Sequence, residues 1–169
     1  MPTSKSTRTP ITILGIDPGF ADTGYAVIRV HGQVMTYIAC GSITSSPREI
    51  FSDRLLLLEA GLEKILNKFK PTLVAVEKIF FAQNVTTGIT VAHARGVILL
   101  TIARHHTLLA EYTPLEVKQS LTSYGHATKP QVGQMVKTLL KLSSLPQQDD
   151  AVDALAIAIC AHFRNKTWV

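Results

Sequence analysis

Two short apolar runs in the sequence each end in a carboxylate. Residues 11–16 are mostly apolar or β-branched and lead into Asp17 and the turn pair Pro18-Gly19, while residues 72–76 repeat the pattern and end at Glu77. Such runs predict buried strands, which proline and glycine end. Ligands of open α/β sheets bind just beyond the carboxyl ends of strands. The pattern therefore favours a functional edge carrying both acids, although one such acid alone could equally cap a turn or a helix.

The remaining strands complete a mixed sheet. Residues 23–30 and 34–43 read as two further strands joined by a short hairpin connection at residues 31–33, so the first three strands form an antiparallel meander. The strand at residues 72–77 follows a crossover helix and is expected to lie parallel to the first strand. A last short strand is expected at residues 108–111. The sequence thus predicts an α/β fold with a five-stranded sheet, antiparallel first and then parallel, flanked by helices.

The first helix has a clear start signal. Ser46, Pro47 and Glu49 provide an N-cap serine, a proline at the first helical position and a glutamate three residues after the cap, so a helix is expected to begin here. Lys70-Pro71 should end it. Apolar residues at spacings of three and four form one stripe that faces the sheet: Phe51, Leu55, Leu58, Leu62, Ile65 and Phe69.

A second helix, at residues 87–104, carries small residues at every fourth position. These are Gly88, Ala92 and Gly96. Such a stripe lets another backbone approach closely, and either the sheet or the same helix of a second subunit would fit it. Further helices are expected at residues 114–121, from Lys129 to about residue 141, and from Asp149 onward.

Length and charge narrow the class of protein. The 169 residues, 46% of them hydrophobic, suit one domain at residues 11–169 preceded by a flexible basic tail at residues 1–10. No apolar stretch approaches the roughly 20 residues that span a bilayer. The formal charge of +5 favours a polyanionic partner such as nucleic acid. Two cysteines far apart in apolar segments indicate reduced core residues, and a cytoplasmic protein is expected.

The last helix adds two more acids to the pattern. Asp150 and Asp153 are three residues apart and are expected on one face of its first turn. Acids are also common there because they interact favourably with the helix dipole, which explains Asp149 and Asp150. Asp153 is different, because it lies in a small, apolar segment that should press on the sheet. A buried carboxylate without a partner costs several kcal/mol, so we expect Asp153 to face a cation.

These four acids predict a metal site if they meet at one end of the sheet. Carboxylates at close range repel one another and raise their own pKa values unless cations intervene. Mg²⁺ or Mn²⁺ is the natural choice for oxygen ligands. Two such ions, about 3.5–4 Å apart, activate a water and stabilise the leaving oxygen in phosphoryl displacement. Together with a basic surface, this chemistry describes a nuclease.

Two other features bear on nucleic-acid binding. Phe80-Phe81 directly follows the second strand-end acid, where an exposed aromatic ring could stack on bases, although at least one of the two suits the core. Lys129 stands at the start of a helix after a loop rich in glycine and hydroxyl residues. Free backbone N–H groups and a lysine would hold a phosphate there, while a solvated surface lysine is the simpler interpretation.

Taken together in this order, the motifs resemble the RuvC family of Holliday-junction resolvases, from about residue 11 to residue 162. The matching segments are Gly15-Ile16-Asp17-Pro18-Gly19, Thr23-Gly24-Tyr25, Val76-Glu77 with Phe80 and Asn84, Ala94-Arg95-Gly96, Val117-Lys118-Gln119, and Asp150-Ala151-Val152-Asp153-Ala154-Leu155-Ala156. The resemblance implies a ribonuclease H-like fold, a homodimer, and Mg²⁺-dependent paired nicking of a four-way DNA junction. A branch-migration motor complex is the partner that it implies.

The resemblance also assigns roles to residues. Its catalytic, metal-binding acids fall on Asp17, Glu77, Asp150 and Asp153, and its basic active-site residues, which contact DNA, fall on Lys118 and Lys129. Phe80 matches an aromatic residue that stacks at the opened centre of the junction. The doublet Asp149-Asp150 leaves Asp149 as an alternative third acid, although the spacing to Asp153 favours Asp150.

Three rival functions are weighed against this interpretation. An actin-like or sugar-kinase ATPase would use a similar glycine-containing turn to bind phosphate but needs two such domains. A ribonuclease H acting on RNA–DNA hybrids would share the fold and metals, so competition between hybrid and junction substrates separates the two. A junction-binding protein without catalysis is the third, and retention of all four acids argues against it.

Overall fold

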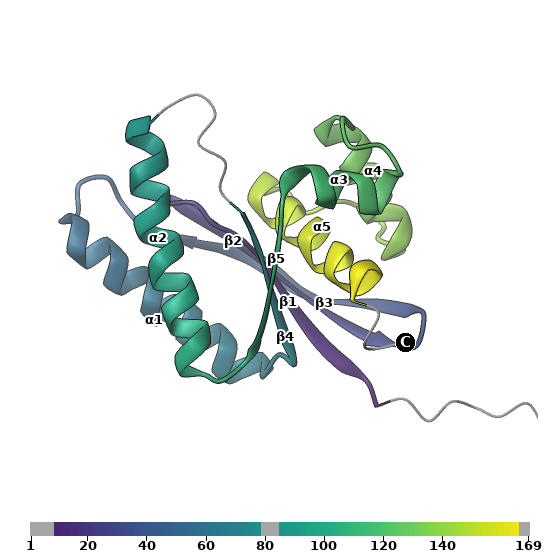
Figure 1. The fold of residues 1–169 in the computed structure, drawn as a ribbon, viewed down its shortest axis with the longest axis horizontal. Helices are drawn as coiled ribbons and strands as arrows, with labels where there is room; N and C mark the ends of the chain where they lie inside the picture. Colours follow the sequence, from purple (N-terminus) through teal and green to yellow (C-terminus); the bar gives the residue numbers. More distant parts are fainter. Residues whose placement is uncertain (1–8, 79–84, 166–169) are drawn as a thin grey trace, which may run out of the picture.

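The computed structural model describes residues 9–78 and 85–165 and contains a five-stranded sheet flanked by helices (Figure 1). The strands are β1 (Ile11–Asp17), β2 (Asp22–His31), β3 (Val34–Thr44), β4 (Leu73–Glu77) and β5 (Leu108–Tyr112). The helices are α1 (Phe51–Phe69), α2 (Val85–Arg104), α3 (Pro114–Thr122), α4 (Lys129–Leu139) and α5 (Asp149–Arg164).

The sheet has the predicted mixed topology. Its strand order is β3-β2-β1-β4-β5. β1 and β3 each pair antiparallel with β2, while β4 lies parallel to both β1 and β5. Parallel strands need a crossover, and α1 and α2 provide the two crossovers into β4 and β5. The prediction of three antiparallel strands followed by parallel ones is therefore confirmed.

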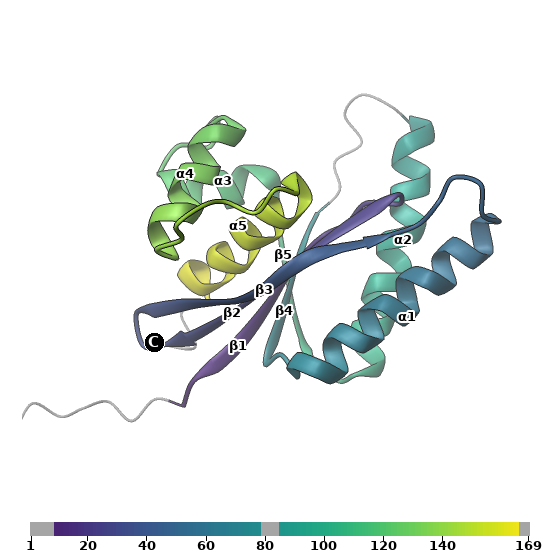
Figure 2. The ribbon, with the colours of Figure 1, turned by 180° about the vertical axis from the view of Figure 1, so that it is seen from behind.

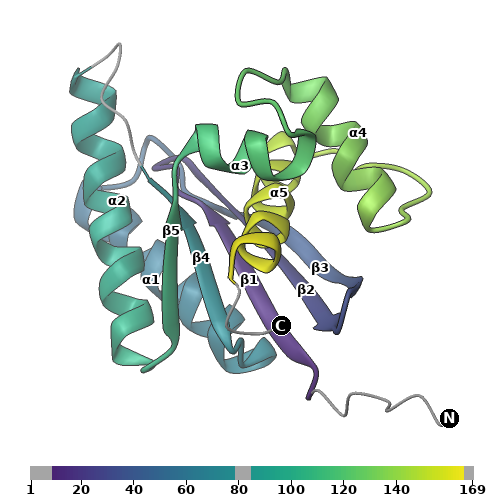
Figure 3. The ribbon, with the colours of Figure 1, turned by 45° about the vertical axis from the view of Figure 1, so that its right-hand side comes forward.

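The helices form one layer on each face of the sheet. α5 lies across one face, with α3 and α4 beside it, and α1 and α2 cover the other face (Figures 2 and 3). β1 supplies side chains alternately to both layers, as a strand buried on two sides must. Ile13 belongs to the core under α5, while Leu14 and Ile16 belong to the core under α1 and α2. The acid at the end of β1 is consequently fixed between two packed layers.

Close contact between α5 and the sheet depends on two glycines. A Cβ on Gly15 would overlap the carbonyl oxygen of Ala154, and a Cβ on Gly24 would overlap that of Asp150. Because both positions lack a side chain, the α5 backbone rests directly on β1 and β2. This packing places the acidic first turn of α5 beside the carboxyl end of β1.

The predicted start of the first helix was wrong. α1 begins at Phe51, because Ile50 is extended (φ −62°, ψ 140°) and separates the helix from the preceding turn. The start signal forms an isolated turn instead: the Ser46 N–H donates to the Glu49 carboxylate at 2.9 Å, and the Glu49 N–H donates to the Ser46 carbonyl at 3.1 Å. The capping interaction is therefore real, but Ile50 does not continue it into a helix.

The other element boundaries lie close to those predicted. α1 ends before Lys70, as predicted from Lys70-Pro71, and Lys70 adopts a left-handed conformation (φ 43°) at the helix end. Phe80 and residues 1–8 of the predicted tail lie outside the described residues. Cys160 is buried as expected, and Cys40 is half-buried. None of the helices in the described ranges is long and apolar enough to cross a membrane.

Candidate active site

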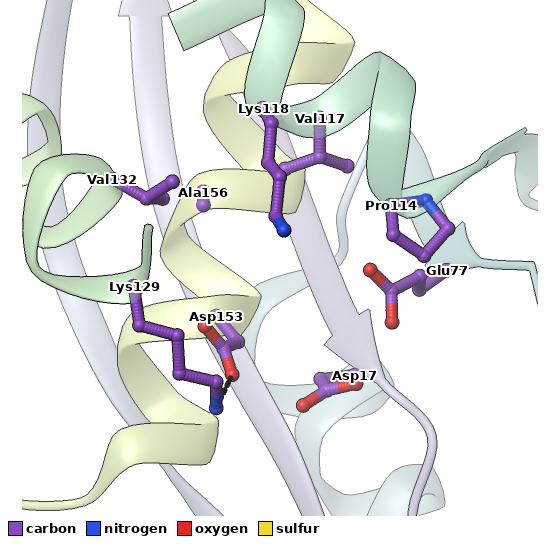
Figure 4. A pocket seen from close by; sticks show the side chains of 9 residues that line it. All are labelled: Asp17, Glu77, Pro114, Val117, Lys118, Lys129, Val132, Asp153 and Ala156. Atoms are coloured by element: carbon purple, nitrogen blue, oxygen red, sulfur yellow. Dashed lines mark hydrogen bonds and ion pairs between the residues drawn. The ribbon is translucent and has the colours of Figure 1, made fainter. Parts of the chain in front are cut away.

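Three of the predicted acids line one cavity at the carboxyl end of the central strands. The register pairs Ile16 with Val76, so Asp17 and Glu77 end neighbouring parallel strands. Asp153 reaches the same cavity from α5 (Figure 4). The cavity has a volume of about 360 Å³, and its lining residues are Asp17, Glu77, Pro114, Val117, Lys118, Lys129, Val132, Asp153 and Ala156.

The two strand-end acids are electrostatically strained. Burial, followed by repulsion from Asp153 and Asp150, raises the pKa of Asp17 from 3.8 to about 7. Burial, followed by repulsion from Asp17 and Asp153, raises the pKa of Glu77 from 4.5 to about 7. Within the described part of the chain, no hydrogen bond or ion pair reaches either carboxylate. A positive charge placed between them would therefore stabilise the ionised carboxylates and offset the costs of their burial and mutual repulsion.

Lys129 supplies one positive charge to the cavity. Its Nζ donates to Oδ2 of Asp153 at 2.8 Å, and this hydrogen bond is the main reason that the pKa of Lys129 is raised. Its side chain comes from the first residue of α4, where the backbone N–H of Thr128 donates to Oε1 of Gln131 at 2.8 Å. The prediction that Asp153 faces a cation is met here by a lysine. The Lys129 side chain is 70% exposed, so it remains accessible to an incoming anion.

Lys118 approaches the acids from α3. In Figure 4 it points from α3 towards the carboxylates, and its charge lowers the pKa of Glu77. Two contacts of Glu116 hold α3 in place: its carboxylate accepts from the Thr113 N–H at 2.8 Å and pairs with Arg164 of α5 at 3.1 Å. Both predicted lysines thus lie at the same cavity as three of the acids.

Asp150 occupies a neighbouring position. It lines an adjoining cavity of about 480 Å³ with Thr90, Val91 and the turn that connects β1 and β2. Its charge still contributes to the raised pKa of Asp17. Asp149, the alternative third acid, lies on the other side, in a pocket that also contains Lys129 and Asp153. The three acids at the start of α5 thus point towards different parts of the site.

The sequence pattern alone missed two residues beside these acids. Asp22 begins β2 and, by its charge, helps to raise the pKa of Asp150, second only to burial. Arg54 of α1 contacts the turn that follows Asp17. The position of Asp22 in the turn between two strands was a usable signal. Arg54 gave no signal, because its place depends on how α1 packs.

The donor set suits a hard divalent cation. Asp17, Glu77 and Asp153 supply carboxylate oxygens in one cavity, and Asp150 adds negative charge nearby. Among the described residues, no three His, Cys, Asp or Glu side chains are gathered closely enough to complete a metal site. Lys129 pairs with Asp153 in this arrangement. The residues therefore fit magnesium-like ions, which would draw the carboxylates together.

The fold and the site together define a ribonuclease H-like nuclease. Comparison with known proteins identifies the family. The model of the family "Crossover junction endodeoxyribonuclease RuvC" matches residues 13–162. The RuvC proteins of Ruminiclostridium cellulolyticum and Rubrobacter xylanophilus are 49% and 48% identical to this chain, over 88% and 94% of it and 89% of each relative.

A solved structure agrees with this match. The Thermus thermophilus RuvC in complex with a Holliday junction substrate has a TM-score of 0.88 and 31% sequence identity, covering 93% of this chain and 96% of that one. The chain therefore belongs to the RuvC family of crossover junction endodeoxyribonucleases. The resemblance inferred from the motifs is confirmed, and so is the ribonuclease H-like fold.

Proposed function

We propose that this chain resolves four-way DNA junctions by paired, symmetric nicks that depend on Mg²⁺, in homologous recombination and DNA repair. The observation that carries the proposal is the cavity in which Asp17, Glu77 and Asp153 lie beside Lys118 and Lys129. Carboxylates for a metal and cations for a phosphate are the two requirements of metal-assisted phosphodiester cleavage. The Thermus relative, which is bound to a Holliday junction substrate, supports the choice of DNA.

The proposed metal ligands are Asp17, Glu77, Asp150 and Asp153. Their oxygens suit two Mg²⁺ ions, with Mn²⁺ as a substitute. When bound, such ions lower the pKa of a coordinated water and stabilise the leaving oxygen of the phosphodiester. Lys129 lowers the pKa values of both Asp17 and Glu77, and Lys118 lowers that of Glu77, so the two lysines partly offset the burial and repulsion that raise these pKa values.

The lysines are proposed to hold the scissile phosphate. Lys129 is paired with Asp153. If that carboxylate bound a metal cation instead, the Lys129 ammonium would be free to contact the DNA. Lys118 reaches the cavity from α3 and would contact the same phosphate from the other side (Figure 4). Charge-assisted hydrogen bonds of this kind position the phosphate and stabilise the charge that develops on it. By family resemblance, Phe80, outside the described residues, stacks at the opened centre of the junction.

A homodimer is the proposed assembly, with α2 at its centre. A Cβ on Gly96 would meet nothing within 4 Å, so this part of the small stripe faces away from the sheet of its own subunit. Leu100, one turn further along α2, is 52% exposed, and Leu108 and Leu109 on β5 are exposed as well. An open, apolar helix face with small residues suits close packing against a second copy.

We expect Leu100→Glu to weaken this dimer. A charge at the apolar helix face would lose its hydration on association, so the dimer dissociation constant should rise by about tenfold or more. Sedimentation velocity across a concentration series measures the change. The matched control is Leu56→Glu, which alters a similarly exposed leucine, 61% accessible, on α1. Equal effects of the two substitutions, or none, would contradict a dimer built on α2.

The remaining assignments rest on the family resemblance. A branch-migration motor complex is the proposed partner, and the cytoplasm is the proposed location. Both agree with a basic chain that acts on DNA, with a formal net charge of +5.

A substrate competition tests the proposed function. The protein is given a labelled four-way junction, a linear duplex and an RNA–DNA hybrid of matched sequence, with Mg²⁺ or with EDTA. We expect symmetric nicks in the junction alone, only with Mg²⁺, and competition only by unlabelled junction. Preferred cleavage of the hybrid would instead indicate a ribonuclease H. Junction binding without any cleavage would leave a binding protein and remove the catalytic assignment.

A further inference from the structure

The turn between β1 and β2 directly follows Asp17 and has little freedom. Thr23 is buried, and its hydroxyl donates to the Gly19 carbonyl at 2.6 Å. A Cβ on Gly19 would overlap the carbonyl oxygen of Asp22, so the chain reverses as tightly as a glycine permits. The backbone after Asp17 is therefore held from inside the turn.

Arg54 holds the same turn from outside. Its Nη2 donates to the carbonyl oxygen of Phe20 at 3.4 Å, and its Nε donates to the hydroxyl of Ser45 at 3.0 Å. The guanidinium lies over the Phe20 ring, with Cζ 3.8 Å from the ring centroid. A planar guanidinium can form both hydrogen bonds and stack at the same time, and a lysine ammonium cannot.

Neighbouring groups support this arrangement. The hydroxyl of Ser45 also donates to the Phe20 carbonyl, at 3.0 Å, and its N–H donates to the Ala21 carbonyl at 2.9 Å. The ring of Phe51 also stacks on the Phe20 ring, with centroids 4.9 Å apart. Arg54 takes part in none of the ion pairs found in the described ranges. The described contacts of its side chain therefore concern the turn and Ser45, which follows β3.

The turn also borders the acids of the site. Gly19, Phe20 and Asp22 line the cavity that Asp150 faces. β2 then continues through Gly24, which lies against the Asp150 backbone. A shift of the turn would consequently move Asp17 at one end and the wall beside Asp150 at the other.

We propose that Arg54 is a positioning residue, which keeps the turn after Asp17 in the geometry that the carboxylates need to bind divalent cations. The inference rests on the proposed function, since it takes Asp17 as a metal ligand. Groups that orient metal ligands without touching the metal typically affect metal affinity by 10–100-fold. Arg54 would act in this way through the Phe20 carbonyl, at a distance from the DNA phosphates.

The test is Arg54→Lys, which keeps the charge and removes the forked hydrogen bonds. We expect the Mn²⁺ dissociation constant, measured by calorimetry on the DNA-free protein, and the Mg²⁺ concentration for half-maximal cleavage to rise about tenfold. Cleavage at saturating Mg²⁺ should recover to within about threefold of the wild type, as expected when metal affinity is the main loss. Hydrogen exchange of a peptide spanning residues 17–24 should become faster in the metal-free protein.

Controls separate positioning from a general loss of structure. Ser45→Ala removes a second donor to the Phe20 carbonyl and should give a smaller change in the same direction, even if Arg54→Lys folds poorly. Ser52→Ala, an exposed change on the same helix, and Arg104→Lys, in an exposed ion pair at the far end of α2, should change neither metal affinity nor exchange.

Two results would overturn the inference. One is unchanged metal affinity and unchanged exchange in both Arg54→Lys and Ser45→Ala. The other is weaker junction binding in EDTA with an unchanged Mg²⁺ requirement, which would make Arg54 a DNA contact. If the wild-type protein itself cleaves no junction with Mg²⁺, the proposed function fails instead, and metal binding and exchange still decide the role of Arg54.

Discussion

Replacing Asp17 with asparagine should reduce junction cleavage by roughly 10³-fold or more, while leaving junction binding in EDTA within a few-fold of the wild type. Asp17 ends β1 at the centre of the acidic site, and an amide cannot replace the charge that a divalent cation requires. Losing several kcal/mol of metal-based stabilisation corresponds to this factor, since each ~1.4 kcal/mol is tenfold in rate. Single-turnover cleavage of a labelled junction measures the loss. Activity above a tenth of the wild-type rate would contradict the assignment of Asp17.

The same substitution should stabilise the metal-free protein at high pH. Burial and neighbouring acids raise the pKa of Asp17 from 3.8 to about 7, so the folded protein binds this proton more tightly than the unfolded chain. Above pH 7 the folded protein bears the cost of an ionised, buried carboxylate, and below pH 4 both states are protonated and the cost vanishes. We expect the free energy of unfolding to rise by roughly 2–4 kcal/mol at pH 8 and by much less at pH 4.

Urea unfolding in EDTA at the two pH values measures this difference. Asp53→Asn, at an exposed position of α1, is the control and should change the free energy of unfolding little at either pH. A gain for Asp17→Asn that is equal at both pH values would show that the effect is unrelated to the ionisation of Asp17. Together, lost cleavage and gained stability would show that Asp17 serves function at a cost to the stability of the fold.

Replacing Lys129 with methionine should lower cleavage by roughly 10²–10³-fold, the range for losing one group that stabilises developing charge. Lys129 pairs with Asp153, and its charge lowers the pKa values of both Asp17 and Glu77. Without it, the pKa values of these carboxylates should rise, so the loss of cleavage on lowering the pH should begin at a higher pH than in the wild type. Cleavage rates between pH 6 and pH 9 at several Mg²⁺ concentrations measure both effects.

The matched control for Lys129 is Lys137→Met, in the last turn of the same helix. It removes the same charge from the protein at a distance from the cavity and should have less than a threefold effect at moderate salt. Lys129→Arg should retain part of the activity, because it keeps a charge beside Asp153. If Lys129→Met and Lys137→Met behave alike, the ammonium of Lys129 has no specific role at the site.

The sequence predicted the sheet and its acidic edge well, because both follow from local patterns. Asp17 and Glu77 each end a run of β-branched and apolar residues, and a right-handed crossover brings such strands side by side. Lys129 could be placed at a helix start from Pro130 and the preceding loop. These features depend on neighbouring residues, which a single sequence displays directly.

Features that depend on packing between distant elements could not be predicted in this way. The directions of Asp150 and Asp153 are set by the rotation of α5 on the sheet, which Gly15 and Gly24 determine through close contact. The contact of Arg54 with the turn after Asp17 depends on the placement of α1, whose start was predicted four residues too early. A periodic pattern identifies the buried face of a helix but not the contacts along it.

The carboxylates around this cavity are proposed to hold the divalent cations that promote DNA cleavage. The most direct measurement is anomalous diffraction at the manganese absorption edge, from crystals of the protein with a four-way junction soaked briefly in Mn²⁺. We predict anomalous peaks within coordination distance of Asp17 and Asp153, with the Lys129 ammonium moved from Asp153 to a DNA phosphate. Peaks elsewhere, or none, with the 2.8 Å pair between Lys129 and Asp153 intact, would contradict the account.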